Sequence, residues 1–481
     1  MGSEMSEGAE TAKNRSNVDV LKKSDFYKCT RNAAGLNEPK DRRNDRIESL
    51  VYLLRNREVG KSSPYMNMTF GNKCKIANRF LPNRGVEIDY YNGKVFCGIY
   101  NKDGSRYLTG SQDRRLRLYK SDDCSYQLLS TFAATDVGWS IIDVAFSPDQ
   151  KSFAYSTWSS YLHICPVDGD LEKLDALPLV ENGRRFCVFS FAFSGDNREV
   201  LAAANDGCLY VYDREHSSKV AKVRAHHYDA NCVTYADETS NIIYTAGDDG
   251  LIKVWDRRTL RENPSVGVGI LAGHADGITY LDSRGDGRFL ISNSKDQSIK
   301  LWDIRQFTKE EDVSEAVCFV SNMNWDYRWQ EVPKKLINSH KSKLPGDTSV
   351  MTYKGHAVTK TLIRCRFSPM ENTGQQFIYT GSGTGHVVVY NALTGKIVQR
   401  YKAHRSCVRD IHWHPQRMEY MTASWDCLLK RWTYQHDFED GEEIFSKTDD
   451  NYVITNNGSL QKIRRSLRLA NNRNNIGESV M

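Results

Sequence analysis

The sequence has no long apolar run. A transmembrane helix needs about 18 or more consecutive apolar residues, and no such stretch occurs. The N-terminus also lacks the short apolar core of a signal peptide. We therefore expect neither a membrane span nor a secretory leader, and no membrane partner. Charge of one sign is scarce too, since the net charge is only +6 over 481 residues. A balance this small gives no reason to expect direct binding to nucleic acid.

Disulfide and zinc spacings are missing as well. The chain has 12 cysteines, but no two of them form a Cys-x-x-Cys pair. Neither a disulfide framework nor a zinc site is therefore indicated. Several cysteines lie in apolar, strand-like runs, which predicts buried free thiols in a reducing compartment. These are Cys97, Cys165, Cys187 and Cys365.

Motifs of the common enzyme classes are absent. The chain has no Walker loop, nucleophile elbow, kinase signature or His-Glu-x-x-His. His412 and His414 alternate along a strand-like segment and would share one face, as half of a metal site would. No third ligand is apparent nearby. We expect no catalysis, no metal and no cofactor.

The chain does contain a repeat. From Val95 to Gln435, segments that alternate apolar and polar residues are separated by Gly, Asp, Asn or Pro. Two adjacent repeats end in Trp-Asp-x-Arg, beginning at Trp255 and Trp302. Outside an interruption at 307–353, the chain offers about 42 residues to each of seven repeats, as expected for four-stranded blades. The pattern predicts an all-β fold, a seven-bladed WD40 β-propeller over 95–435, with an outer strand near 86–91 closing the ring.

Three repeats carry a His, a hydroxyl, an Asp and a Trp at matching offsets. Such residues also form catalytic triads, but a catalytic site is normally unique, and this set recurs at the repeat period. We interpret the sets as structural, hydrogen-bonded tetrads. They are His226, Thr245, Asp249 and Trp255; His274, Ser292, Asp296 and Trp302; and His404, Thr422, Asp426 and Trp432. Repeat one has Asp113 but no Gly-His before it, and repeats two and six have Ser159 and Thr384 in place of the Asp. We expect these blades to be less well stapled.

The segments outside the repeats are predicted as follows. Residues 1–43 are polar and charged, which predicts a disordered tail. Within 44–60, Ile47, Leu50, Val51 and Leu54 share one face of a short amphipathic helix, which packs on the propeller or in a partner's groove. Residues 61–94 lead into the propeller. Residues 436–481 form an acidic, then basic tail, mostly disordered. Its arginines suit a nuclear-import signal, a solvated end or a nucleic-acid contact: Arg464, Arg465, Arg468 and Arg473.

The two repeat endings belong to 16-residue boxes. Ile243–Arg258 and Leu290–Arg305 resemble the "DWD" motif of cullin-4 ligase substrate receptors. The second box departs from the motif at Asn293, where a small residue is usual. The resemblance implies that Arg258 and Arg305 contact an adaptor protein. The alternative is that both arginines only pair with carboxylates of their own blades.

More of the chain, from about 46 to 435, resembles the WD-repeat protein 23 family of cullin-4 associated factors. The most specific stretches are 324–330, 343–347 and 361–369, with 184–186 and 205–211 in support. The resemblance implies a non-catalytic substrate-recognition subunit of a cullin-4 RING ubiquitin ligase. Such a subunit binds the damage-specific DNA-binding protein 1 adaptor and presents protein substrates, among them stress-response transcription factors, for proteasomal degradation. It also implies a nuclear and cytoplasmic location.

The resemblance assigns roles to particular residues. The expected adaptor-binding residues are Arg258, Arg305, Asp256, Asp303, Leu50 and Leu54. The long interruption is expected to be a loop between two blades. It holds anchor-type side chains, which either bind a partner or pack the loop on the propeller rim: Trp325, Tyr327, Arg328 and Trp329. The competing function is a general interaction scaffold that reads peptides or histones without any ligase.

Overall fold

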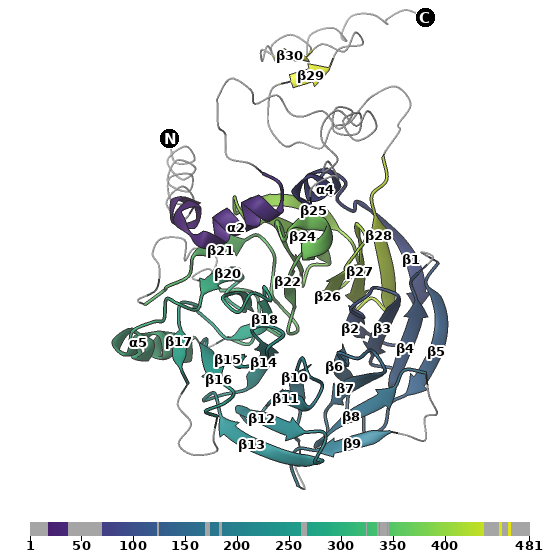
Figure 1. Cartoon of the computed structure of the whole chain (residues 1–481), viewed down its shortest axis with the longest axis vertical. Coiled ribbons are helices and arrows are strands. Elements are labelled where there is room, and N and C mark those ends of the chain that lie inside the picture. Colours follow the sequence, from purple (N-terminus) through teal and green to yellow (C-terminus); the bar gives the residue numbers. More distant parts are fainter. Residues whose placement is uncertain are drawn as a thin grey trace, which may run out of the picture. The chain divides into compact units, whose positions relative to one another are not determined.

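A computed structural model describes most of the chain (Figure 1). The described residues are 18–36, 70–122, 125–168, 174–181, 185–260, 267–323, 325–333, 336, 344 and 346–436, with two strands at 452–454 and 460–462. Residues 1–435 form one compact unit and 436–481 a second. Within the described part, no helix is long and apolar enough to cross a membrane.

The first unit is the predicted seven-bladed β-propeller, with its four-stranded sheets arranged in a ring (Figure 1). Blades one to three are β2 (Val95–Tyr100), β3 (Arg106–Ser111), β4 (Arg115–Lys120) and β5 (Gln127–Ala133); β6 (Ile141–Phe146), β7 (Ser152–Thr157), β8 (Tyr161–Pro166) and β9 (Asp175–Pro178); and β10 (Val188–Phe193), β11 (Glu199–Ala204), β12 (Cys208–Asp213) and β13 (Ser218–Arg224). Blades four and five are β14 (Ala230–Tyr235), β15 (Ile242–Gly247), β16 (Ile252–Asp256) and β17 (Gly269–Leu271); and β18 (Ile278–Ser283), β19 (Phe289–Ser294), β20 (Ser298–Asp303) and β21 (Met351–Lys354). Blades six and seven are β22 (Cys365–Phe367), β23 (Phe377–Gly381), β24 (His386–Asn391) and β25 (Ile397–Lys402); and β26 (Val408–Trp413), β27 (Glu419–Ser424), β28 (Leu428–Thr433) and β1 (Arg84–Tyr90).

The seventh blade joins the two ends of the propeller. Its fourth strand, β1, comes from before the first repeat and pairs antiparallel with β28, placing Arg84 opposite Thr433 and Tyr90 opposite Leu428. This strand lies where the sequence placed the ring-closing segment. Because closure rests on a pairing between the ends of the domain, it is the longest-range contact that folding must make.

Buried side chains fill the space between neighbouring blades. The second strand of each blade is almost wholly buried, as in β19, whereas outer strands such as β5 and β25 are largely exposed. Val, Ile, Tyr and Phe suit such strands because they pack well on a pleated surface. The four cysteines expected to be buried thiols are buried and unbridged: Cys97, Cys165, Cys187 and Cys365.

The prediction of a disordered tail up to residue 43 is wrong for residues 18–36. This segment is helical, with α2 spanning Asp25–Ala33 and Ser24 as its N-cap. Leu21 and Phe26 are fully buried in a core that also contains blades five and six. The segment is ordered because two apolar side chains find a distant partner surface, although its own composition is polar. Residues 1–17 and 37–43 lie outside the described residues, as does the helix expected at 44–60.

The prediction that the interruption at 307–353 connects two blades is wrong. The interruption lies inside blade five, between β20 and β21, and its last three residues belong to β21. The error arises because the sequence repeat ends at the third strand of a blade, so that the segment after Trp-Asp precedes the fourth. The insertion contains α5 (Glu310–Ser321). Its Ala316 packs beside Leu251 and Ala272 of blade four.

Two more helices and one hairpin complete the described elements. The lead-in segment contains α4 (Phe70–Ala77), which contacts the one-turn helix α7 (Met370–Thr373) of blade six. In the second unit, β29 (Tyr452–Ile454) and β30 (Leu460–Lys462) pair as an antiparallel hairpin. The rest of the predicted acidic and basic tail lies outside the described residues.

Candidate protein-interaction site

The two ends of the blades carry different residues, and we name the two faces accordingly. The tetrad face is formed by the loops before the first strand and between the second and third strands, which contain the tetrad His and Asp residues. The box face is formed by the loops at the other end, which include Arg258 after β16 and Arg305 after β20. The two arginines therefore share one face, as tandem copies of a motif in adjacent blades must.

The tetrad of blade four forms one connected chain of hydrogen bonds. Nδ1 of His226 lies 2.9 Å from the Asp249 carboxylate, and its Nε2 lies 2.9 Å from Thr245 Oγ1. Trp255 Nε1 donates to the same hydroxyl at 2.9 Å. A carboxylate only accepts, so Nδ1 carries the proton and the Thr245 hydroxyl donates to Nε2. Every polar atom of this buried set is satisfied, which supports the structural interpretation.

Blades five and seven repeat this geometry. His274 lies 2.9 Å from Asp296 and 2.6 Å from Ser292, and Trp302 donates to that hydroxyl at 2.7 Å. In blade seven the corresponding distances are 2.9, 2.7 and 3.0 Å. Burial would raise the pKa of Asp426, but the hydrogen bond and charge interaction with His404 lower it to about 2. The side chains of each set hydrogen-bond to one another within their own blade.

Blade one replaces the tetrad with a tyrosine network. Tyr91 occupies the place of the His and bonds both Thr109 and Tyr119 at 2.8 Å. Tyr119, at the place of the Trp, donates to Asp89 of β1 at 2.6 Å. The sequence predicted weaker stapling here, but this network connects the blade to the ring-closing strand of blade seven. No His-Asp signature announces it, which is why sequence reasoning missed it.

The departure at Asn293 has a structural cause. Its amide nitrogen donates to the Ile363 carbonyl at 2.9 Å, and its oxygen lies 2.8 Å from His356 Nε2. Tyr390 OH lies 2.9 Å from the other ring nitrogen of His356. Asn293 belongs to blade five and His356 precedes blade six, so the side chain couples two blades. A small residue at this position would lose that connection.

Arg258 is held in an outward-pointing position. Its Nε and Nη2 donate to the Asp256 carboxylate at 3.0 and 2.7 Å, and its backbone N–H donates to the same group at 3.0 Å. The side chain is nevertheless 73% exposed. It does pair with a blade carboxylate, as the alternative interpretation held. The pairing fixes the guanidinium while leaving it accessible to a partner.

Arg305 has the same bracing and one further contact. Its Nη2 lies 3.3 Å from Asp303 and donates to Asp25 of α2 at 3.1 Å, with the side chain 59% exposed. Arg288 also approaches both carboxylates, at 2.8 Å from Asp303 and 2.9 Å from Asp25. The N-terminal helical segment is thus attached directly to the second box.

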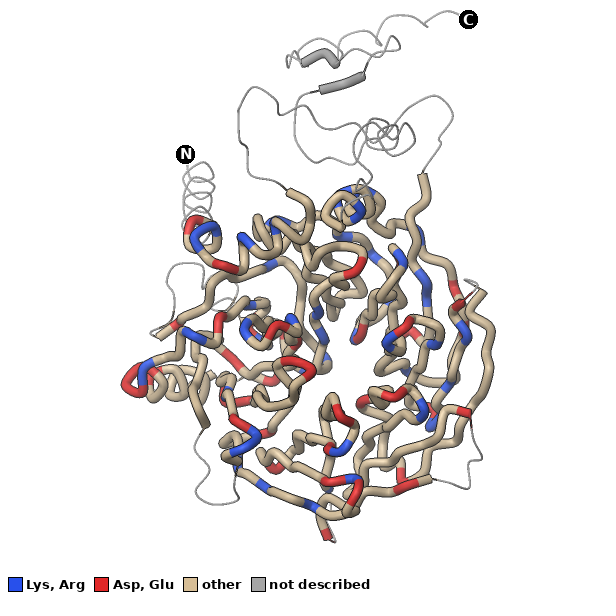
Figure 2. The backbone as a smooth tube through the Cα atoms, in the orientation of Figure 1, with Lys and Arg blue, Asp and Glu red and all other residues tan. Residues whose placement is uncertain are grey.

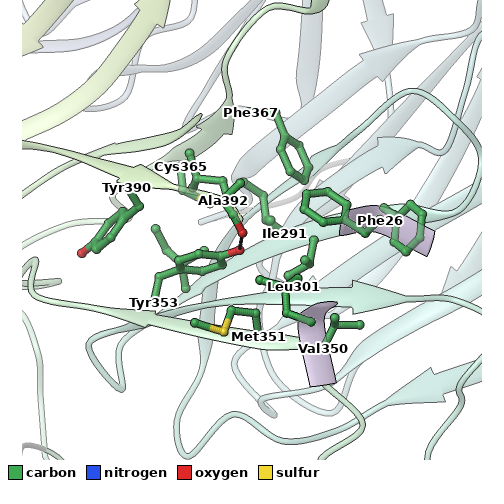
Figure 3. Close-up of a cluster of buried hydrophobic side chains, with 14 of the residues drawn as sticks. Phe26, Ile291, Leu301, Val350, Met351, Tyr353, Cys365, Phe367, Tyr390 and Ala392 are labelled. Carbon is green, nitrogen blue, oxygen red and sulfur yellow. Dashed lines mark hydrogen bonds between the residues drawn. The ribbon is translucent and has the colours of Figure 1, made fainter. Parts of the chain in front are cut away.

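Helix α2 is seated by an aromatic contact beneath this ion-pair network. Figure 3 shows Phe26 pointing from the helix toward Phe367. Its ring meets Phe289 edge-on at 5.3 Å and lies 6.2 Å from Phe367, and Arg284 stacks over it at 4.9 Å. Leu50 and Leu54, the residues expected to dock on the adaptor, lie outside the described residues. The helical segment that the structure places beside a box is α2.

The anchor-type residues of the insertion divide into two roles. Trp325 Nε1 donates to Asp276 at 2.6 Å, and the Tyr327 ring lies under Lys295 Nζ at 4.4 Å. These two side chains attach the loop to the tetrad face. Trp329 points away and is 86% exposed, and the neighbouring Arg328 is exposed too. The packing and partner-binding interpretations thus apply to different residues.

The insertion also contains a third Trp-Asp-x-Arg, at residues 325–328. Arg328 donates to Asp326 at 2.9 and 2.8 Å from Nε and Nη2, and at 3.0 Å from its backbone N–H. The local geometry matches that of Arg258 and Asp256. It lies on the tetrad face, however, and belongs to no blade. Local geometry alone therefore does not distinguish the box arginines; their tandem position on one face does.

The histidine pair considered as half of a metal site is engaged elsewhere. His412 Nδ1 accepts from the Tyr100 backbone N–H at 3.3 Å, whereas His414 Nε2 donates to the Gly104 carbonyl at 3.0 Å. In the described part of the chain, no three His, Cys, Asp or Glu side chains are placed to hold a metal ion.

Comparison with known proteins agrees with this architecture. The family model "WD domain, G-beta repeat" matches residues 217–256, 266–303 and 395–433, the three repeats that contain complete tetrads. A protein of Caenorhabditis elegans named "DDB1- and CUL4-associated factor 11 homolog" is 38% identical over 75% of this chain, which spans 64% of that protein. Its Caenorhabditis briggsae counterpart is 37% identical, with 76% of this chain and 68% of that protein covered. The "LEC14B protein" of Lithospermum erythrorhizon is 39% identical, with 75% and 77% covered. The chain therefore belongs to the WD-repeat family that includes the DDB1- and CUL4-associated factor 11 homologues and the LEC14B protein.

Proposed function

We propose that this chain is the substrate-recognition subunit of a cullin-4 RING ubiquitin ligase. In this role it bridges the damage-specific DNA-binding protein 1 adaptor and protein substrates, which are then ubiquitylated and degraded by the proteasome. It contributes no catalytic residue of its own. The names of the two nematode relatives support the adaptor and the ligase. We further propose that it belongs to the WD-repeat protein 23 branch, acts in nucleus and cytoplasm, and takes stress-response transcription factors among its substrates.

The observation that carries this proposal is the paired presentation of Arg258 and Arg305. Both follow the third strand of a blade, the blades are adjacent, and each guanidinium is fixed by the Asp two residues before it. Fixing a long side chain in advance reduces the entropy lost on binding. Arginines presented in this way are common anchors at protein interfaces. A partner that spans blades four and five on the box face would meet both.

Helix α2 extends the proposed adaptor surface. It lies against the second box through Asp25, and its polar residues remain exposed around that contact. We propose that α2 borders the adaptor site next to Arg305. The first box has no such neighbour among the described residues. The two arginines would then contribute unequally, with Arg258 the more accessible.

The test is adaptor binding by a charge-reversed double variant, Arg258→Glu with Arg305→Glu. We expect co-purification with the adaptor to fall by more than about tenfold, since each lost arginine contact removes on the order of 1.4 kcal/mol or more. Circular dichroism and the thermal midpoint must show that the variant is folded. Arg328→Glu is the matched control, because Arg328 has the same local geometry on the other face. It should leave adaptor binding unchanged.

The competing function, a scaffold without a ligase, predicts a different result. In that case a folded double variant would keep every partner, because the arginines would only brace their blades. Loss of the adaptor in the double variant but not in Arg328→Glu contradicts the scaffold. Equal adaptor binding by the native chain, the double variant and Arg328→Glu contradicts the proposed receptor function.

A further inference from the structure

A row of aromatic side chains crosses the tetrad face. Trp425 of blade seven and Trp139 of blade two both contact Phe96 of blade one, with ring centroids 5.6 and 5.2 Å away. In the next loop of blade two, Trp158 meets Phe189 of blade three edge-on at 6.3 Å. Four consecutive blades of the ring, seven, one, two and three, thus contribute to one aromatic row.

Blade two presents two of these indoles to solvent. Trp139 is 46% exposed and Trp158 is 37% exposed. Their loops touch, because a Cβ added to Gly138 would lie 2.8 Å from the Trp158 carbonyl. Blade two also has Ser159 at the position of the tetrad Asp, so these loops lack the hydrogen bonds of a complete tetrad. Adjacent exposed tryptophans mark interaction surfaces more often than structural ones.

Three cations lie along the same row without a carboxylate partner. Lys94 Nζ sits over the Trp425 ring at 4.1 Å, and the Arg409 guanidinium lies 5.2 Å from the Phe96 centroid. Lys360 belongs to the loop whose Val358 packs against Cys407, and its charge, like those of Lys94 and Arg409, opposes the rise in the pKa of the Cys407 thiol that burial causes. Among the described residues, none of the three makes an ion pair.

Arg409 differs in this respect from the other arginines near the ring's centre. Arg364 donates to Asp143 at 2.6 Å and to Asp410 at 3.1 Å, and Arg366 also donates to Asp410. These pairings occupy both carboxylates, whereas Arg409 donates only to a backbone carbonyl, that of Phe96. Charges of both signs meet around the centre of the ring (Figure 2). Among the described residues, Arg409 makes no ion pair like those of Arg364 and Arg366.

Two buried donors in this cluster have no acceptor. Arg409 is only 2% exposed, yet its Nε has no hydrogen-bond partner, and the same holds for the Trp425 indole N–H. Both groups contact the Phe96 ring. Buried donors are normally satisfied, because an unpaired one costs about 1–3 kcal/mol. A site that lacks acceptors and carries excess positive charge is complementary to an anion.

We propose that this surface binds an extended peptide of a partner protein that combines a carboxylate with a large apolar side chain. We call it the tryptophan–cation surface, and it comprises Trp139, Trp158, Trp425, Phe96, Lys94, Lys360 and Arg409. The apolar side chain packs on the exposed indoles of blade two, and the carboxylate meets Lys94 of blade one and Lys360 of blade six, while the buried Arg409 of blade seven adds positive charge from the interior. We take these peptides to be the parts of the substrates that the chain recognises, and in this respect the proposal rests on the proposed function.

A peptide fits the surface better than a nucleic acid does. The same face carries Asp113 and the exposed Asp136 beside the aromatic row. A polyanionic backbone gains affinity by covering many cations at once, and these carboxylates would repel it. A single carboxylate next to an apolar group can avoid them. The limited number of free cations also matches one or two acidic groups.

The test selects ligands on the isolated chain, without adaptor or ligase. Phage libraries of 12-residue peptides, one with blocked and one with free C-termini, are panned against the immobilised protein. We expect the enriched peptides to place Asp, Glu or a free C-terminus within a few residues of Trp, Phe or Leu. Replacing that Glu with Gln, or the terminal acid with an amide, then identifies which carboxylate binds.

Variants of exposed residues complete the test without disturbing the core. Trp139→Ala and the double variant Lys94→Ala with Lys360→Ala should each weaken the selected peptides by about tenfold or more. Tyr228→Ala, an exposed aromatic on the same face, and Lys219→Ala are the controls and should bind normally. The proposal is wrong if the enriched peptides lack a carboxylate, if the variants bind like the native chain, or if a single-stranded oligonucleotide displaces the peptides at physiological salt. Because no adaptor is present, failure here leaves the arginine test of the ligase function standing, and the reverse also holds.

Discussion

The carboxylate of Asp25 accepts a hydrogen bond at 3.1 Å from Arg305, which lies 280 residues further along the chain. The same carboxylate approaches Arg288 at 2.9 Å. One acidic residue of the N-terminal helix therefore joins two arginines of blade five. Exposed ion pairs of this kind contribute little to stability, about 0–1 kcal/mol. Their value is geometric, because they fix the helix in register with the box.

Phe26 is the large apolar side chain that α2 buries in the core of blades five and six. Its ring is fully buried between Phe289 and Phe367. Phe26→Ala removes this contact, and truncating a buried Phe typically costs about 3–5 kcal/mol. We expect α2 to detach while the propeller stays folded, so that amides of residues 18–36 exchange with solvent much faster. Hydrogen-exchange mass spectrometry measures this. Lys28→Ala, on the exposed side of the helix, should change nothing, and continued protection of α2 in Phe26→Ala would show that other contacts hold it.

The sequence predicted the propeller well because its information is local. Strand alternation, turn residues and the recurring His, hydroxyl, Asp and Trp each lie within one repeat, and Trp255 and Trp302 mark the period. Helix α2 could not be predicted in the same way. Its buried surface is small, and the residues that cover Phe26 lie more than 260 positions away. Composition indicates that such a segment is polar, but it does not reveal a distant groove that accepts one ring.

In the candidate site, too, local features were predicted and features that depend on distant residues were not. Motif matching located Arg258 and Arg305, and the structure shows that they share one face. Motif matching also treated Asn293 as a departure from the motif in the second box, because the partner of Asn293, His356, lies 63 residues away in another blade. The tryptophan–cation surface had no sequence signal at all, since its residues come from four blades and no two of them share a motif.

Asn293→Ser tests whether this position serves the box motif or the contact between blades five and six. The change restores the small residue usual in the box but leaves one nitrogen of His356 without a partner, while the Ile363 carbonyl keeps only the hydrogen bond from Thr279. We expect the free energy of unfolding to fall by about 1–3 kcal/mol, with no gain in adaptor binding. Urea denaturation measures the loss. In a His356→Phe background the same substitution should cost less, because the shared hydrogen bond is already gone. Equal costs in both backgrounds would mean that the two side chains are not coupled.

His356 should make the propeller sensitive to mild acid. Burial lowers its pKa to about 4, so the ring is neutral in the folded chain. An unfolded histidine has a pKa near ~6.5. The stability that neutral His356 contributes is therefore complete above this value and is lost as pH falls toward 4, by on the order of 3 kcal/mol at most. The slope of unfolding free energy against pH between 6.5 and 4.5 should be shallower for His356→Phe than for the native chain. Identical slopes would contradict a neutral, buried ring.

Thr422 tests whether a tetrad acts as a structural unit. Its hydroxyl accepts from Trp432 Nε1 at 3.0 Å and lies 2.7 Å from His404 Nε2. Thr422→Val keeps the shape of the side chain but leaves two buried polar groups without their partner, at a cost of about 1–3 kcal/mol each. Thr131→Val, on an exposed outer strand, is the matched control and should be nearly neutral. We expect urea unfolding to show a clear loss for Thr422→Val while the far-ultraviolet circular dichroism remains native. If both variants are equally stable, the tetrad of blade seven contributes nothing measurable, and its recurrence in three blades needs an explanation other than stability.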